Sequence, residues 1–237
     1  MEIEHSEFHD QLVRGLAHKM NNILSLFHGY LSVIMENKRL DTDTRESLEN
    51  IRAGASAASE LLDRANSLAR PTSLIWREID LEPFLWNLKS SLSSMIPEDV
   101  ELTLDVPENL PHILVDPGRL RTTIREVVKN ACEAIPHKGK VSIHVVGQAD
   151  APAPTHAMQS LRWVSIDIRD NGIGIPTNLH EKIFQPFYST RLRQSATGLG
   201  LTVALGLMQQ LGGMLRFESE PGNTVFHLLL PSITQKY

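Results

Sequence analysis

Two glycine clusters in the second half of the chain constrain the fold most. Asp170-Asn171-Gly172-Ile173-Gly174-Ile175 follows an apolar run at 163–168, and Thr197-Gly198-Leu199-Gly200-Leu201 opens another at 199–211. Because glycine has no Cβ, a ligand can approach such a backbone closely, and Asp170 can accept a hydrogen bond from a nucleobase amine. The N–H groups that open the second run would meet a phosphate at a helix N-terminus. The two clusters therefore predict a nucleotide site.

Composition narrows the class of protein. A chain of 237 residues that is 41% hydrophobic has room for one or two globular domains. Its net charge of -5 and the absence of a long basic run do not favour nucleic acid or an anionic membrane as a partner. The single cysteine, Cys132, cannot form an internal disulfide, which is typical of a cytoplasmic protein. No apolar stretch approaches the roughly 20 residues of a spanning helix, so we expect no membrane segment.

The first 70 residues carry two amphipathic patterns. Apolar side chains recur every three or four residues in 5–37, and a narrower stripe of small residues follows in 44–69 until Pro71. The first stripe consists of Leu12, Leu16, Met20, Ile23, Phe27, Leu31 and Ile34. Two helices joined by a short turn cannot cover both stripes, so we expect residues 1–70 to form a hairpin that dimerises into a four-helix bundle.

After Pro71 short apolar runs alternate with helical patterns. This alternation predicts an α/β sandwich over 74–237 in which one helical layer covers a sheet, and the fold class of the whole chain is therefore α+β. We expect strands at 74–79, 100–106, 141–146, 162–168, 214–219 and 224–230, helices at 81–95, 117–135 and 199–211, and an exposed loop at 148–155.

Further motifs accompany the two clusters in a fixed order. Glu126 and Asn130 lie on a predicted helix upstream, Phe184 and Phe187 lie between the clusters, and Gly212-Gly213 and Thr224 follow. Together these motifs resemble the N, G1, F, G2 and terminal boxes of histidine-kinase ATP-binding domains, which belong to the Bergerat superfamily that also holds gyrase. The resemblance covers roughly residues 74–231. It implies a Bergerat-type sandwich that binds ATP and Mg²⁺.

The resemblance also implies roles for individual residues. Asp170 would accept from the adenine amino group, with Gly172 and Gly174 beside the ring, and Asn130 would help to hold Mg²⁺. Glu126 stands where kinases usually have Asn and gyrase-like ATPases have a catalytic Glu, so it would hold Mg²⁺ or polarise the attacking group, or be a surface residue. The remaining assignments are Gly198, Leu199 and Gly200 at the phosphates, Arg191 as a cation beside them, and Thr224 as either a water-mediated adenine contact or a turn residue.

The segment Leu16-Ala17-His18-Lys19-Met20-Asn21-Asn22 resembles the phosphoacceptor box of histidine kinases. At about 100° per residue, the apolar stripe centres roughly opposite His18, so the imidazole should face away from the bundle core. Asn22 lies one turn further on the same face. Taken alone, His18 would be a surface histidine; next to an ATP module it becomes the candidate phosphoacceptor.

These features favour the transmitter core of a two-component histidine kinase. It would phosphorylate His18 from MgATP and pass the phosphoryl group to an aspartate of a response-regulator receiver domain. Family members with Asn at the position of Asn22 often also dephosphorylate their regulator. One departure concerns Lys19, because most members carry an acid there that orients the imidazole and accepts its proton.

Two other functions stay open at this point. Lys19 and Glu126 are compatible with a catalytically weak phosphotransferase or regulatory scaffold, and Glu126 with a gyrase-like ATPase. The intact Asp170 and glycines oppose the first alternative, and the hairpin that bears His18 opposes the second. Because no sensor domain is evident before residue 5, we expect the input to come from a separate protein, a ligand of the bundle or a region beyond this sequence.

Overall fold

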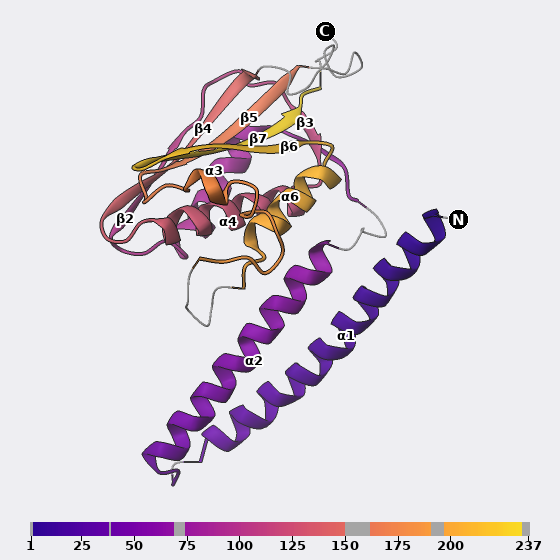
Figure 1. Ribbon diagram of the computed structural model, residues 1–237, viewed down its shortest axis with the longest axis vertical. Helices are drawn as coiled ribbons and strands as arrows, with labels where there is room; N and C mark the ends of the chain where they lie inside the picture. The colour runs from indigo at the N-terminus through magenta and orange to yellow at the C-terminus, as the bar shows by residue number, and fades with distance from the viewer. Residues whose placement is uncertain (1, 38, 69–73, 150–161, 191–196, 234–237) are drawn as a thin grey trace. The chain divides into compact units, whose positions relative to one another are not determined.

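A computed structural model of the protein describes residues 2–37, 39–68, 74–149, 162–190 and 197–233. The chain divides into two compact units, one helical and one built on a sheet (Figure 1). The predicted domain boundary at 70–74 falls almost entirely in the segment 69–73, which lies outside the described residues. In the described part of the chain, no helix has both the length and the apolar character needed to cross a membrane.

The helical unit contains a hairpin of α1, Glu2–Met35, and α2, Thr42–Leu68 (Figure 1). Asp41 caps the start of α2, because its carboxylate accepts hydrogen bonds from the backbone N–H of Thr44 (2.8 Å) and from the Thr44 hydroxyl (2.7 Å). These hydrogen bonds lower the pKa of Asp41. The short polar turn between residues 35 and 42 therefore ends at a defined helix start.

The face of α1 that is covered within the hairpin differs from the apolar stripe. Its buried and half-buried side chains recur at alternating spacings of four and three, and the Asn21 amide donates to the Asp63 carboxylate on α2 (2.9 Å). The covered face consists of Ala17, Asn21, Leu24, His28, Leu31 and Met35. Leu31 is the member that the predicted stripe shares with this face.

The other described side chains of the stripe are open to solvent. Five of its side chains, each 45–53% exposed, are Leu16, Met20, Ile23, Phe27 and Ile34. Leu12 lies among the residues whose side chains are not described. At about 100° per residue, this open stripe lies about 90° around α1 from the covered face. A single hairpin therefore covers one apolar face and leaves a second one exposed.

The second unit is a five-stranded sheet in the order β2-β4-β5-β7-β6. β2 and β4 are parallel, and the other neighbours are antiparallel. The strands are β2 Val100–Asp105, β4 Gly139–Ala149, β5 Trp163–Asp170, β6 Met214–Glu220 and β7 Asn223–Pro231. A separate antiparallel pair joins β1, Arg77–Ile79, to β3, Ile113–Val115.

One face of the sheet carries the helices α3, Leu81–Ser93, α4, Pro117–Ala134, and α6, Gly200–Gln210 (Figure 1). A short 3-10 helix, η1, spans Thr177–Leu179. Asp116 caps α4 by accepting from the N–H groups of Gly118 and Arg119, and Pro117 suits the first turn because it needs no N–H partner there. The apolar faces of these helices and of the central strands form one core.

The predicted fold class is confirmed, and its departures from the expected elements are local. β1 covers only Arg77–Ile79 of the strand expected at 74–79, and β3 was not predicted because three residues between Pro111 and Asp116 are too short for an alternating pattern. β4 continues to Ala149, so the start of the loop predicted at 148–155 was wrong, and the remainder lies outside the described residues.

Cys132 is buried in the core, which raises the pKa of its thiol to about 11.

The open stripe on α1 predicts that the full chain is a dimer at micromolar concentration. Phe27→Glu should produce a monomer, because it would bury a charge in the interface. Val33→Glu is the matched control, since Val33 is also exposed (69%) but lies about 120° around the helix from Phe27. Light scattering measures the mass directly, and a monomeric wild-type chain would contradict the prediction.

Candidate functional site

Asp170, the last residue of β5, is an almost fully buried carboxylate. It is 1% exposed, its Oδ1 accepts a hydrogen bond from the Gly172 N–H (2.9 Å), and its Oδ2 is buried with no hydrogen-bond partner among the described residues. Burial disfavours the charge and raises the pKa of Asp170 to about 6, while the Gly172 N–H acts in the opposite direction. Because a buried oxygen without a partner is costly, Oδ2 is available to accept from a ligand.

The turn after Asp170 packs directly on the end of α4. The Ile173 N–H donates to the Ala134 carbonyl (3.0 Å), and a Cβ on Gly172 would lie 2.5 Å from that carbonyl oxygen. Gly174 has φ +77°, and a Cβ there would lie 2.7 Å from the Glu220 carbonyl oxygen. The neighbouring backbone therefore requires both glycines, whereas the sequence suggested them for the close approach of a ligand.

Thr224 lies beside Asp170. The two residues are direct partners across β5 and β7, and Thr224 is 2% exposed. Its hydroxyl is 2.8 Å from the Ser219 hydroxyl on β6, which in turn accepts from the Ile175 N–H (2.8 Å). Of the two interpretations that the sequence left open, the structure places Thr224 inside β7, next to the buried carboxylate, and the turn itself at Gly222.

One face of α4 connects this turn to the start of α6. Glu126 and Asn130 are half-buried and one helical turn apart, and Ala134, one turn further, touches the turn after Asp170. At the other end, a Cβ on Gly200 would lie 3.0 Å from Glu126 Oε2. The face spans about 12 Å over eight residues, with Asn130 in its middle. Carboxylate and amide oxygens of this kind are suitable ligands for Mg²⁺.

The first N–H groups of α6 have no partner within the helix. Gly198 has φ +64°, Leu199 is 1% exposed, and Gly200 begins the helix. An anion would be favoured here, because the first N–H groups of a helix have no partner within it. The cation predicted at Arg191 lies outside the described residues.

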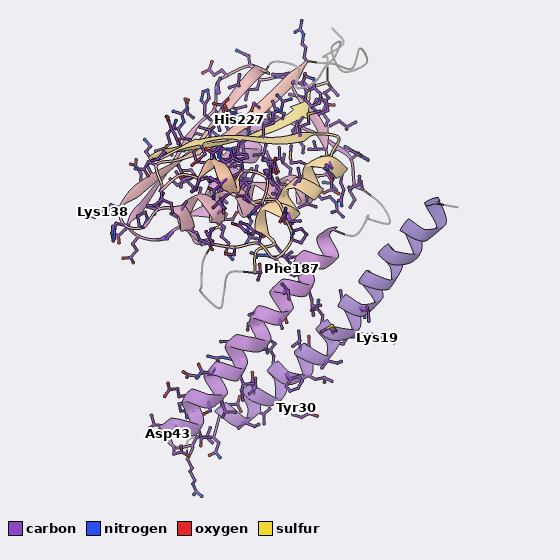
Figure 2. All side chains as sticks on the ribbon, in the orientation of Figure 1. Lys19, Tyr30, Asp43, Lys138, Phe187 and His227 are labelled. Carbon is purple, nitrogen blue, oxygen red and sulfur yellow. The ribbon has the colours of Figure 1, made fainter. Side chains whose placement is uncertain are left out.

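Phe184 and Phe187 have different surroundings. Phe184 packs edge-on against Phe217 (ring centroids 5.8 Å apart), and its carbonyl accepts from the Thr202 hydroxyl on α6 (3.0 Å). Phe187 is 68% exposed with φ +64°, and it is labelled in Figure 2. Phe184 therefore packs against the core, whereas Phe187 is open to solvent.

His18 is exposed on α1, and so are Lys19 and Asn22. The helical spacing turns His18 away from both the open stripe and the face covered by α2. The Asn22 amide nitrogen is 3.5 Å from His18 Nδ1, which is a long contact for a hydrogen bond. Figure 2 labels Lys19 on α1. The structure thus brings His18 and Asn22 together on an accessible surface.

The metal-binding capacity of the described residues is limited. Among them, no group of three or more His, Cys, Asp or Glu side chains is arranged to hold a metal ion. A divalent cation near Asn130 and Glu126 would therefore take further oxygen ligands from a bound molecule or water.

Sequence reasoning missed Ser219. Its hydroxyl joins Thr224 to the Ile175 backbone, but a single serine near the end of a strand carries no sequence signal. The pairing of Ser219 with Thr224 across β6 and β7 is what brings it to the site.

The chain was compared with known families and proteins. Residues 115–234, just over half of the chain, match the family described as histidine kinase-, DNA gyrase B- and HSP90-like ATPase. The sensor kinase CckA of Brucella abortus is 29% identical over 231 residues, 95% of this chain and 24% of CckA. The sensory histidine kinase/phosphatase NtrB of Klebsiella oxytoca is 30% identical over 224 residues, 93% of this chain and 61% of NtrB.

Solved structures share the fold. Full-length ShkA in complex with AMPPNP has a TM-score of 0.75 at 23% identity, covering 96% of this chain and 47% of ShkA. The histidine kinase AdeS of Acinetobacter baumannii has a TM-score of 0.60 at 19% identity, covering 92% of this chain and 98% of AdeS. The two-unit chain thus has the architecture of these proteins, whereas it spans less than two thirds of the curated relatives CckA and NtrB.

The buried acceptor predicts the effect of Asp170→Asn. The amide oxygen of Asn can still accept the hydrogen bond from the Gly172 N–H, so its NH₂ group would take the place of Oδ2. That NH₂ group would then face the amino group of a bound adenine, and two donors cannot form a hydrogen bond. Calorimetry should show ATP affinity reduced by about 100-fold or more, with no fall in melting temperature. Unchanged ATP affinity would contradict the whole nucleotide-site assignment.

The same variant tests the pH dependence. Because the folded pKa of Asp170 (about 6) exceeds its ordinary 3.8, the folded state holds the proton more tightly, and the free energy of unfolding should fall as pH rises from about 4 to 6. Wild-type ATP affinity should fall as pH drops through 6, because the protonated oxygen no longer accepts. Both dependences should be weaker in Asp170→Asn.

Proposed function

Since this chain belongs to the family of histidine kinase-, DNA gyrase B- and HSP90-like ATPases and has the transmitter core of a two-component histidine kinase, we propose that it phosphorylates His18 from MgATP and passes the phosphoryl group to an aspartate of a response regulator. The P–O bond to the leaving ADP breaks and a P–N bond to the imidazole forms. The regulator's carboxylate then displaces the imidazole.

The observation that carries the proposal is the buried Oδ2 of Asp170, which has no hydrogen-bond partner among the residues that the structure describes. An adenine amino group would supply the hydrogen bond that this oxygen lacks, and Thr224 on the neighbouring strand would supply a hydroxyl beside it, directly or through a water. Gly172 and Gly174 add no side chain to the turn that follows Asp170. Asp170 and Thr224 would thus select adenine as the base.

The α4 face and the α6 N-terminus would hold the phosphates. Asn130 and Glu126 lie on the α4 face between the turn after Asp170 and Gly200, and the N–H groups at the start of α6 would favour an anion. When bound, Mg²⁺ would bridge the phosphates and offset their negative charge. Arg191 would add a cation. Glu126 would share Mg²⁺ with Asn130 or polarise the attacking group.

His18 suits the acceptor role because a neutral imidazole nitrogen is a nucleophile near pH 7. Its exposure on α1, away from both apolar faces, supports access by an ATP-binding domain and by a regulator. Lys19 stands where an acid would accept the imidazole proton, and a protonated amine cannot take that role. Self-phosphorylation of His18 should therefore be slower than it would be with an acid at position 19, even when ATP is bound.

The partners follow from the same proposal. The homodimer would form through the open stripe of α1, and the receiver domain of a response regulator would dock near His18. Input would come from a separate sensor protein or from a further region of a longer chain, and the reaction would take place in the cytoplasm. The chain spans 24% of CckA and 61% of NtrB, so the activities of those whole proteins come to it only as part of this proposal.

A regulator phosphatase activity is the second candidate function. It is supported by Asn22, whose amide lies beside His18, and by the relative NtrB, which is named a kinase/phosphatase. On the face that it shares with His18, the amide would orient a water towards a docked phosphoaspartate. A scaffold that has lost catalysis finds less support, because the buried acceptor and the glycine turn are intact.

Labelling with γ-labelled ATP tests the proposal. A kinase should acquire acid-labile, base-stable phosphate that is lost in His18→Gln. ATP hydrolysis without labelling would instead indicate a gyrase-like ATPase, and binding without either reaction would indicate a scaffold. Any label that persists in His18→Gln would exclude His18 as the acceptor.

The labelling rate carries a sharper prediction for Lys19. Lys19→Glu should raise the rate at His18 by about 10²-fold, because it restores a proton acceptor beside the imidazole. Lys19→Gln removes the positive charge without adding a base, so it separates general-base assistance from simple charge removal. If Lys19→Glu is no faster than wild type, the lysine is not the weak point.

Asn22→Ala should slow dephosphorylation of the regulator by about tenfold or more, because the water would lose its orienting amide. The 3.5 Å contact is too long to hold the imidazole firmly, so labelling of His18 should change little. Decay of a phosphorylated receiver domain with and without the chain measures the effect. An equal loss of labelling and dephosphorylation would show that Asn22 supports His18 instead.

A further inference from the structure

A row of charged side chains crosses the sheet on the face away from the helices. His227 alternates along β7 with Phe226 and Leu228, which are fully buried in the core, so its ring points to the opposite face. Figure 2 labels His227. Its direct partner on β5 is Asp167, and the same register continues to both edges of the sheet. From β2 to β6, the row consists of Asp105, His144, Asp167, His227 and Arg216.

The row contains two histidine–carboxylate contacts of similar length and different exposure. His227 Nδ1 is 2.8 Å from Asp167 Oδ1, and these two side chains are 26% and 19% exposed. His144 Nδ1 is 2.9 Å from Asp105 Oδ2, and these two side chains are 46% and 78% exposed. Because water screens an exposed ion pair, a charge on His227 should contribute more to stability than a charge on His144.

The Asp167 carboxylate is ionised near neutral pH. Burial alone would raise the pKa of Asp167, but hydrogen bonds from His227 and Ser165 outweigh burial and hold the pKa below 3.8. An ionised carboxylate can only accept, so His227 Nδ1 carries the hydrogen and Nε2 gains or loses the titrating proton. Loss of that proton keeps the hydrogen bond but removes the positive charge that strengthens it.

The charges that face His227 favour its protonated form. The hydrogen bond to Asp167 raises the pKa of His227 above 6.5, and burial acts against this increase. The negative charges of Asp167 and Glu218 add to the increase, whereas Arg169 opposes it. The other charged or titratable groups of the row are Arg216, the direct partner of His227 on β6, and His144 and Asp105 on the far side of β5.

We propose that the His227–Asp167 pair is a pH-responsive contact between β5 and β7, which holds the two strands together more strongly when the imidazole is protonated than when it is neutral. Asp170 and Thr224 are partners three residues further along the same two strands, so the contact acts on the strand pair that carries the candidate site. The inference does not depend on the proposed binding of ATP, because it concerns only the pairing of the strands.

The direction of the effect follows from the linkage between protonation and folding. Because the pKa of His227 is above 6.5 in the folded state, its contribution is complete below pH 6.5 and is lost as the pH rises through the folded pKa. Asp167 acts in the opposite direction, since its lowered pKa gives a contribution that is present above pH 3.8 and is lost only in acid. The contribution of Asp170 is common to wild type and His227 variants, so it cancels when they are compared.

The test compares the melting temperatures of wild type and His227→Asn at about pH 6 and about pH 8. The Asn amide can still donate from the position of Nδ1, but it has no titratable charge. Tryptophan fluorescence follows the sheet unit alone, because all three tryptophans of the chain lie in it. The excess of wild type over the variant should be about 3 °C larger at the lower pH. An excess that is equal at both pH values, or larger at the higher one, would overturn the inference.

His144→Asn is the matched control. It removes a titratable ring from the exposed pair of the same row and keeps a donor for Asp105. Its difference from wild type should be nearly the same at both pH values, because the exposed pair is screened. A pH dependence as large as that of His227→Asn would mean that any histidine of the sheet has this effect, and the specific role of His227 would be lost.

A direct measurement on wild type does not depend on whether a variant folds. The imidazole C–H resonances of His227, identified by their loss in His227→Asn or by triple-resonance assignment, give its titration midpoint by NMR, which should lie above 6.5. Asp167→Asn should lower this midpoint, because the amide has no negative charge to favour the protonated ring. A wild-type midpoint at or below 6.5, or one that Asp167→Asn leaves unchanged, would refute the proposed contact.

Discussion

The contact between the turn after β5 and the end of α4 is the constraint on which the site depends. The Ile173 N–H binds the Ala134 carbonyl, and Gly172 approaches that carbonyl more closely than any side chain would allow. This contact places the buried carboxylate of Asp170 next to the helix that carries Asn130 and Glu126. Because a backbone hydrogen bond joins the turn to the helix, the fold sets the spacing between Asp170 and the residues that we propose to bind the phosphates.

Burial makes the ionised form of Asp170 unfavourable, and a bound ligand can offset part of this free-energy cost. Burial alone raises its pKa to about 6, and one of its two oxygens has no partner among the described residues. A ligand that donates to this oxygen stabilises the ionised form and so adds to its own affinity.

The hairpin divides its apolar surface between two faces of one helix. The face that contains Ala17 and Leu31 is covered within the chain, and the face that contains Met20 and Phe27 is open. His18 belongs to neither face, because it is about half a turn from the open stripe and about a quarter turn from the covered one. A helix of this kind can be packed on two sides and still present a reactive side chain on the third.

Much of this could be predicted from the sequence because it depends on local pattern. The helical periodicity of residues 5–37, the glycine clusters and the order of the motifs around Asp170 and Asn130 are properties of neighbouring residues. They were sufficient to predict an α+β chain with one helical layer and to select the candidate residues. The short β3 was missed because three residues cannot show a period.

What only the tertiary structure decided depends on register between distant segments. Thr224 is the partner of Asp170, and Ser219 is the partner of Thr224, because three strands pair in one alignment; a shift of one residue would turn these side chains to the other face of the sheet. The reason for Gly174 likewise lies in Glu220, 46 positions away along the chain. The sequence by itself determined which chemical groups the site contains, whereas strand pairing and close backbone contacts determined which groups meet, because these forces act between residues that no local pattern links.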